Sequence, residues 1–171
     1  MSLAEKLLEE AIRKGVMIAT AESCTAGMIS AAITDVAGSS EIFDRGFVTY
    51  TNNAKQEMLG VTGDTLEKFG AVSEQTACEM AEGALKRSNA QMAIAVSGIA
   101  GPGGSEFKPE GRVCFALAST FMPTRFETIE FGSIGRANVR AGTVSRALEI
   151  LLMALSTLPP NRAKTEFSPN I

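Results

Sequence analysis

Hydrophobic and polar residues follow two periods along the chain, one typical of amphipathic helices and one of buried strands. The predicted helices cover about 3–14, 25–35, 52–59, 73–88 and 136–155. The predicted strands cover about 16–20, 47–50, 92–96, 112–118 and 126–131, the last two as a hairpin. Helices alternate with strands, and a hairpin precedes the last helix. We therefore expect a three-layer α/β/α sandwich with a mixed, mostly parallel sheet that contains at least one antiparallel strand.

The length and the apolar content fit one domain. A chain of 171 residues, 45% of them apolar, can bury a substantial core. No internal repeat or linker divides the pattern. After Pro159 and Pro160 the chain is polar and poor in apolar residues, which predicts a single domain over 1–158 and a flexible tail over 159–171.

The charge pattern argues against polyanionic partners. The net charge is −3 and no long basic run occurs, so we expect no nucleic-acid partner and no membrane partner. The first residues are amphipathic and acidic, unlike a signal peptide, and no apolar run is long enough to span a bilayer. These features predict a cytoplasmic protein. The sequence does not determine the oligomeric state, and a homodimer is the one assembly that we consider.

Two residue types restrict the chemistry. The chain contains no histidine, which excludes a Ser-His-Asp triad, a Cys-His pair and histidine metal ligands. Its three cysteines are odd in number and widely spaced, which indicates reduced thiols and no zinc site. A catalytic base must therefore be Lys, Tyr, Asp or Glu. We expect an activity that needs no metal and no cofactor.

The segment TAESCTAG, residues 20–27, lies where a strand passes into a helix. Hydroxyl side chains there can cap the helix, or one of them, Ser23, can be a nucleophile. Cys24 can be a small buried hydrophobe, although a helix N-terminus favours the thiolate. Main-chain N–H groups around Thr25 and Gly27 could line an oxyanion pocket. Capping and chemistry are compatible, and we expect both.

Lys55 follows Asn52 and Asn53 in the first turn of a predicted helix, not far from Tyr50. A cation at this end of a helix faces the positive end of the dipole, so its pKa should fall. A lysine that is neutral near pH 7 can act as a general base, although most lysines are simply solvated. A serine with a lysine base is a known substitute for a serine with a histidine base.

Two further segments are candidates for ligand binding. Residues 97–111 are rich in Gly and Pro and predict a long loop, where Gly98, Gly101 and Gly103 leave main-chain N–H groups accessible to an anion. A wide turn between strands would need the same residues. Arg136 and Arg140 lie one turn apart at the start of the last helix, where a bound phosphate or a solvated surface would account for both.

Five blocks of sequence, in order, closely resemble the CinA C-terminal domain family. The blocks are TAESCTAG, EIFDRGFVTYTNNAKQEMLGV, GAVSE, VSGIAGPGG and KPEGRV, and the likeness runs from about 4 to 155. The family includes nicotinamide mononucleotide amidohydrolases. The resemblance therefore implies a deamidase that converts nicotinamide mononucleotide and water into nicotinate mononucleotide and ammonia, in pyridine nucleotide salvage.

The resemblance also implies roles for individual residues. It identifies Ser23 as the nucleophile, with Tyr50 and Lys55 as its partner groups, and Arg136 or Arg140 as the arginine of the last helix. The chain has Ala26 where the family commonly has glycine, a small change unless the main chain there requires a positive φ.

Two alternatives remain at this level. One is a nucleotide-binding or partner-binding domain without turnover, which would not require the set Ser23, Tyr50 and Lys55. The other is a cysteine nucleophile at Cys24.

Overall fold

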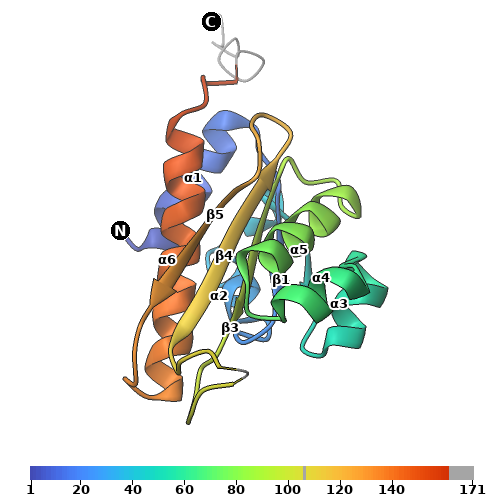
Figure 1. Ribbon diagram of the computed structural model, residues 1–171. Helices are drawn as coiled ribbons and strands as arrows, with labels where there is room; N and C mark the ends of the chain where they lie inside the picture. Colours follow the sequence, from blue (N-terminus) through green and yellow to red (C-terminus); the bar gives the residue numbers. More distant parts are fainter. Residues whose placement is uncertain (106, 162–171) are drawn as a thin grey trace, which may run out of the picture.

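The computed structural model describes residues 1–105 and 107–161, and the predicted tail over 159–171 lies mostly outside the described residues. Six α-helices, one short 3-10 helix and five strands alternate along the described part of the chain (Figure 1). The helices are α1 (Leu3–Lys14), α2 (Met28–Thr34), α3 (Asn52–Leu59), α4 (Gly63–Phe69), α5 (Glu74–Lys86) and α6 (Arg136–Ser156), with η1 at Ser39–Glu41. The strands are β1 (Ile18–Glu22), β2 (Phe43–Val48), β3 (Met92–Gly98), β4 (Arg112–Ser119) and β5 (Arg125–Glu130).

The strands form one mixed sheet in the order β2-β1-β3-β4-β5. β1 is parallel to both β2 and β3, whereas β4 is antiparallel to β3 and to β5. Four strands therefore run in one direction and β4 runs in the other, which confirms the predicted mixed, mostly parallel sheet. The carboxyl ends of β1, β2 and β3 meet at one edge, where ligands collect in sheets of this kind.

Helices cover both faces of the sheet and make the three predicted layers (Figure 1). α1, α2 and α6 pack on one face, and α5, with α3 and α4 against it, packs on the other. The two faces differ in side-chain size, because β3 turns Ile94 and Val96 toward α6 but Ala93 and Ala95 toward α5. Small residues on the second face bring α5 close to the sheet.

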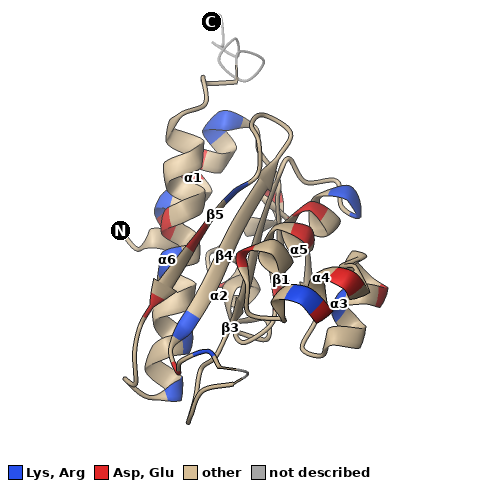
Figure 2. Ribbon diagram, viewed as in Figure 1, with Lys and Arg blue, Asp and Glu red and all other residues tan. Residues whose placement is uncertain are grey.

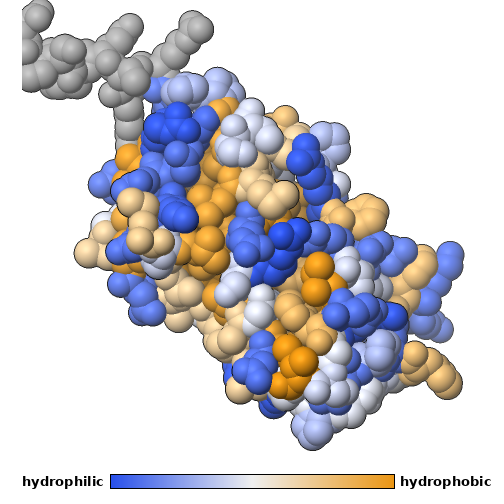
Figure 3. All heavy atoms as spheres, turned by 90° about the vertical axis from the view of Figure 1, so that its left-hand side faces the viewer, coloured by the Kyte–Doolittle hydropathy of each residue, from blue (hydrophilic) through white to orange (hydrophobic). Residues whose placement is uncertain are grey.

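The surfaces of these layers are polar with apolar interruptions. The face that carries α1 and α6 shows hydrophilic residues with several hydrophobic patches between them (Figure 3). Among the described residues, no helix is both long and apolar enough to cross a bilayer.

The observed elements differ from the predicted ones in several places, among them β1, which lies at 18–22 and not at 16–20, and η1, which was not predicted. β2 begins at Phe43 and not at 47, because Phe43 and Arg45 pair with Ile18 and Ala19 of β1, with an irregularity in the register between the two pairs. α4 was not predicted. It is a short helix of 7 residues, and the Thr62 side chain caps it by accepting a hydrogen bond from the N–H of Thr65. α2 begins at Met28 and not at 25, because positive φ values at Ala26 (48°) and Gly27 (98°) keep the chain out of the helical conformation.

Candidate active site

Ser23 lies directly after β1, at the carboxyl end of a central strand. Its N–H donates to the carbonyl of Val96 on β3, at 3.1 Å, which extends the sheet pairing by one residue. Ser23 is buried, with only 8% of the residue exposed. The chain then turns through 24–27 before α2 begins. We call residues 23–27 the nucleophile turn.

A buried carboxylate, and not a hydroxyl, caps the helix after this turn. Gly27 at the N-cap of α2 makes no side-chain capping bond. Instead Glu22, which is fully buried, accepts hydrogen bonds from the N–H groups of Ile29 (2.8 Å) and Ser30 (3.0 Å). It also accepts from the hydroxyls of Thr25 (2.6 Å) and Ser30 (2.8 Å). The prediction that the hydroxyls of this segment cap the helix was therefore wrong, and Ser23 is left free of that role.

Lys55 reaches Ser23 from α3, the helix that follows β2 in the chain. Its Nζ lies 2.9 Å from Ser23 Oγ, and it also donates to the carbonyl oxygens of Thr49 (2.9 Å) and Tyr50 (3.1 Å). Carbonyl oxygens only accept, so each of them must face an N–H of Lys55. In a neutral amine this leaves the lone pair directed at the Ser23 hydroxyl. The three contacts therefore orient Lys55 as a base for Ser23.

Burial lowers the pKa of Lys55 from its ordinary value of 10.5 to about 8. The residue is 1% exposed, and removal from water disfavours the charged ammonium. We predicted a lower pKa from the helix dipole. The direction is confirmed, but its leading cause is burial. A lysine with this pKa is partly neutral near neutral pH, as a general base requires.

This pKa predicts how the stability of the protein depends on pH. Between about 8 and 10.5 the unfolded chain holds a proton on Lys55 that the folded chain has released. The free energy of unfolding of the wild type should therefore rise, relative to Lys55→Met, by about 1.4 kcal/mol per pH unit in that window. Below pH 8 the difference should be constant. Urea unfolding of both proteins from pH 6 to 10 measures it, and parallel curves throughout would contradict the low pKa.

The pKa of Cys24 shifts in the opposite direction from that of Lys55. Burial raises the pKa of its thiol to about 11, and the residue is 5% exposed. The expectation that a helix N-terminus favours its thiolate was therefore wrong, because burial outweighs the dipole at this position. The thiol is protonated at neutral pH, which disfavours it as the nucleophile.

Tyr50 and Arg136 lie side by side at the mouth of the site. The Tyr50 hydroxyl accepts from Arg136 Nη2 at 3.2 Å, and Arg136 Nη1 donates to the carbonyl of Gly101 at 2.8 Å. Tyr50 is 58% exposed, and it contacts Lys55 through its main-chain carbonyl and not through its side chain. The basic residues in the first turns of α6 lie at this end of the molecule (Figure 2).

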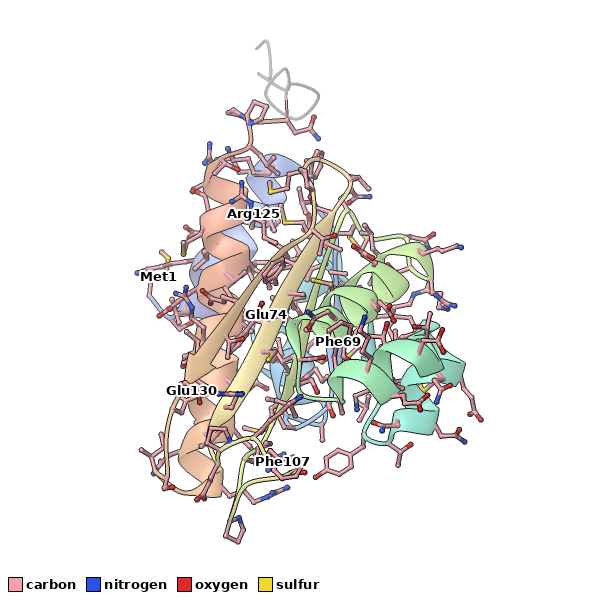
Figure 4. The ribbon with its side chains drawn as sticks, viewed as in Figure 1. Met1, Phe69, Glu74, Phe107, Arg125 and Glu130 are labelled. Atoms are coloured by element: carbon pink, nitrogen blue, oxygen red, sulfur yellow. The ribbon has the colours of Figure 1, made fainter. Side chains whose placement is uncertain are left out.

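These residues line one pocket of about 340 Å³. Ser23, Lys55, Tyr50 and Arg136 share it with the glycine-rich loop, including Gly98, Gly101 and Gly103. Phe107, on the same loop, is exposed at this end of the sheet (Figure 4). The structure thus brings together most of the predicted residues. Thr25, Gly27 and Arg140 are not part of the pocket lining.

The sequence analysis did not select a second group of residues that lines this pocket, which we call the second wall. Ala71, Val72 and Ser97 also line it, and Ser97 Oγ donates to the carbonyl of Ala71 at 2.7 Å. Lys108 Nζ donates to the carbonyl of Val72 at 2.5 Å and so ties the glycine-rich loop to this wall. The block GAVSE, which contains Ala71 and Val72, was the signal in the sequence, but it has no side chain with obvious chemistry.

The site offers few ligands to a metal ion. Within residues 1–105 and 107–161 there is no group of three or more His, Cys, Asp or Glu side chains that could hold one. Glu22 is the carboxylate next to Ser23, and both its oxygens accept from protein donors.

A family model described as the CinA C-terminal domain matches residues 1–155. The chain belongs to this family. Among solved structures, the CinA-type fold of this protein is similar to the competence/damage inducible protein CihA from Agrobacterium tumefaciens. The TM-score is 0.87 at 51% identity, over 91% of this chain and 94% of that one.

Curated relatives of this CinA domain include shorter and longer proteins. The chain is 53% identical over 120 residues to the nicotinamide-nucleotide amidohydrolase PncC of Escherichia coli strain K12. The aligned region covers 70% of this chain and 73% of that protein. The chain is 54% identical over 119 residues to a CinA-like protein of Chlorobium phaeobacteroides strain BS1, but the match spans only 28% of that protein.

Proposed function

We propose that this CinA-domain protein is a nicotinamide-nucleotide amidohydrolase, which hydrolyses the carboxamide of nicotinamide mononucleotide to nicotinate mononucleotide and ammonia. The observation that carries the proposal is the 2.9 Å contact between Lys55 Nζ and Ser23 Oγ in a pocket of about 340 Å³. Relatives named for this activity support the choice of substrate.

In the first half of the proposed reaction, Ser23 Oγ attacks the carboxamide carbon while neutral Lys55 accepts the hydroxyl proton. The oxygen of the tetrahedral intermediate carries a negative charge, and main-chain N–H groups of the nucleophile turn are placed to stabilise it. Cys24 follows Ser23 in this turn and lines the pocket, so its N–H is the candidate for this role. The C–N bond then breaks, Lys55 returns the proton to the nitrogen, and ammonia leaves.

In the second half, water replaces ammonia. Neutral Lys55 takes a proton from water, whose oxygen attacks the ester carbon on Ser23. The ester bond breaks, Ser23 Oγ regains a proton from Lys55, and the product acid releases its proton to solvent and leaves as nicotinate mononucleotide. Water is the only co-reactant, and neither half of this proposed reaction uses a cofactor or a metal.

The remainder of the pocket would hold the nucleotide. We place the phosphate near Arg136 and the glycine-rich loop, because arginine and main-chain N–H groups both suit a phosphate. The Tyr50 hydroxyl, held by Arg136, would help to position the substrate or to relay a proton.

The direct test measures ammonia and nicotinate mononucleotide together after incubation of the purified protein with nicotinamide mononucleotide. We expect equal amounts of both products, in the presence and absence of a chelator, and none with Ser23→Ala. Calorimetry on Ser23→Ala should still detect binding of the nucleotide. A wild-type protein that binds the nucleotide but releases no ammonia would instead be a non-catalytic binding domain.

A further inference from the structure

Arg140 lies next to the active site but does not face the substrate pocket. It is in the second turn of α6, half-buried, and it is absent from the pocket lining. Its Nε donates to the carbonyl of Cys24 at 3.0 Å and its Nη2 to the carbonyl of Thr25 at 3.2 Å. The guanidinium therefore holds two consecutive carbonyls of the nucleophile turn, and it forms no ion pair among the described residues.

The direction of a carbonyl determines the direction of the next N–H. A trans peptide is planar, and its C=O and N–H point to opposite sides. The peptide between Cys24 and Thr25 is trans. With the Cys24 carbonyl directed at Arg140, the Thr25 N–H must point away from Arg140. The carbonyl of Thr25 is held in the same way, so Arg140 fixes two consecutive peptide planes of the turn that begins at Ser23.

A second group holds the same turn from its side chain. Thr25 Oγ1 donates to the buried Glu22, and Glu22 also caps α2. Ala26 adopts a φ of 48°, a conformation that costs a non-glycine residue about 1 kcal/mol or more and persists only where the surroundings impose it. The turn is thus held in a strained geometry by Glu22 on one side and Arg140 on the other.

We propose that Arg140 is a positioning residue for catalysis: it fixes the main chain of the nucleophile turn and so holds Ser23 in line with Lys55, and it does not bind the phosphate. The proposal rests on the proposed amidohydrolase function. It differs from the phosphate role that the sequence suggested for this arginine. Arg136, four residues earlier, lines the pocket and is the matched comparison.

The kinetic experiment compares Arg140→Met and Arg140→Lys with Arg136→Met, using nicotinamide mononucleotide and nicotinamide riboside. A reacting group displaced by about 1 Å can lose about 100-fold in rate, so we expect kcat to fall at least tenfold for Arg140→Met. The KM should change little, and the fall should be the same for both substrates. Arg140→Lys should recover little activity, because an ammonium cannot bond both carbonyls as a guanidinium fork does.

The opposite pattern would overturn the proposal. If Arg140 binds phosphate, Arg140→Met should keep its kcat and raise the KM for the mononucleotide but not for the riboside. That pattern is what we expect of Arg136→Met.

A second readout does not depend on turnover. Cys24 provides one of the two carbonyls that Arg140 holds, and its thiol is buried. We expect iodoacetamide to modify Cys24 at least tenfold faster in Arg140→Met than in the wild type, as followed by mass spectrometry of its peptide. Cys114, which is 2% exposed and lies on β4, should react equally slowly in both proteins and so controls for general unfolding.

The two readouts separate the two hypotheses. An unchanged rate at Cys24 would show that Arg140 does not hold the turn, whether or not the protein is an enzyme. A wild type that releases no ammonia would refute the amidohydrolase function. Faster modification of Cys24 in that case would still establish that Arg140 holds the turn, but the role in catalysis would be refuted.

Discussion

Ser23→Ala should lower kcat for ammonia release by about four orders of magnitude or more, whereas Cys24→Ala should keep most of the activity. The reason is the position of the base, since Lys55 Nζ contacts Ser23 Oγ at 2.9 Å. The thiol of Cys24, with its pKa raised to about 11, stays protonated at neutral pH. Steady-state kinetics with nicotinamide mononucleotide measures both variants. Both residues are small and buried, so the pair is closely matched.

The reverse ranking would identify Cys24 as the nucleophile. A thiol-blocking reagent is a weaker test, because a bulky group on Cys24 would obstruct the pocket that it lines. Mass spectrometry of a trapped acyl-enzyme would add an independent answer, since the modified peptide reports which of the two side chains carries the acyl group.

Lys55→Arg should be nearly as inactive as Lys55→Ala, with a fall in kcat of about 100- to 10,000-fold. Arginine keeps the positive charge but remains protonated at any pH that the protein survives, so it cannot accept the Ser23 proton. Calorimetry should still detect nucleotide binding by the arginine variant. In the wild type, kcat/KM should rise with pH and level off above about 8, the pKa of Lys55.

An active Lys55→Arg enzyme with a raised KM would assign Lys55 to attraction of the phosphate and leave the reaction without its base. A variant that does not fold would be recognised by circular dichroism. The pH profile of the wild type then remains as evidence, and a flat profile between pH 6 and 9 would contradict the mechanism.

The architecture could be predicted because the buried strands are apolar. β3 is buried along nearly its whole length, and its apolar run stands out from its polar flanks. β2 does not stand out from its flanks in this way, because it lies at an edge of the sheet and its residues are mostly half-buried or exposed. Its position depends on main-chain pairing with β1, which side-chain patterns do not record.

The predicted reactive groups Ser23 and Lys55 lie in contact in the structure, but the residues that support them could not be predicted. The absence of histidine and the strand-to-helix junction together indicate Ser23 and Lys55. The supporting role of Glu22 could not be inferred, because a glutamate in the last position of a strand gives no sign that it caps the next helix. The contacts of Arg140 were also hidden, since they join residues 116 positions apart in sequence through main-chain carbonyls.

These main-chain contacts have a consequence for the evolution of the site. Two of the three partners of Lys55 Nζ, and both partners of Arg140, are carbonyl oxygens that every residue type possesses. Substitutions at 49 or 50 leave the acceptors of the base in place, provided that the main chain keeps its course. The orientation of the base therefore tolerates substitution at these positions far better than substitution at 23 or 55, although a change at 50 also removes the hydroxyl that Arg136 contacts.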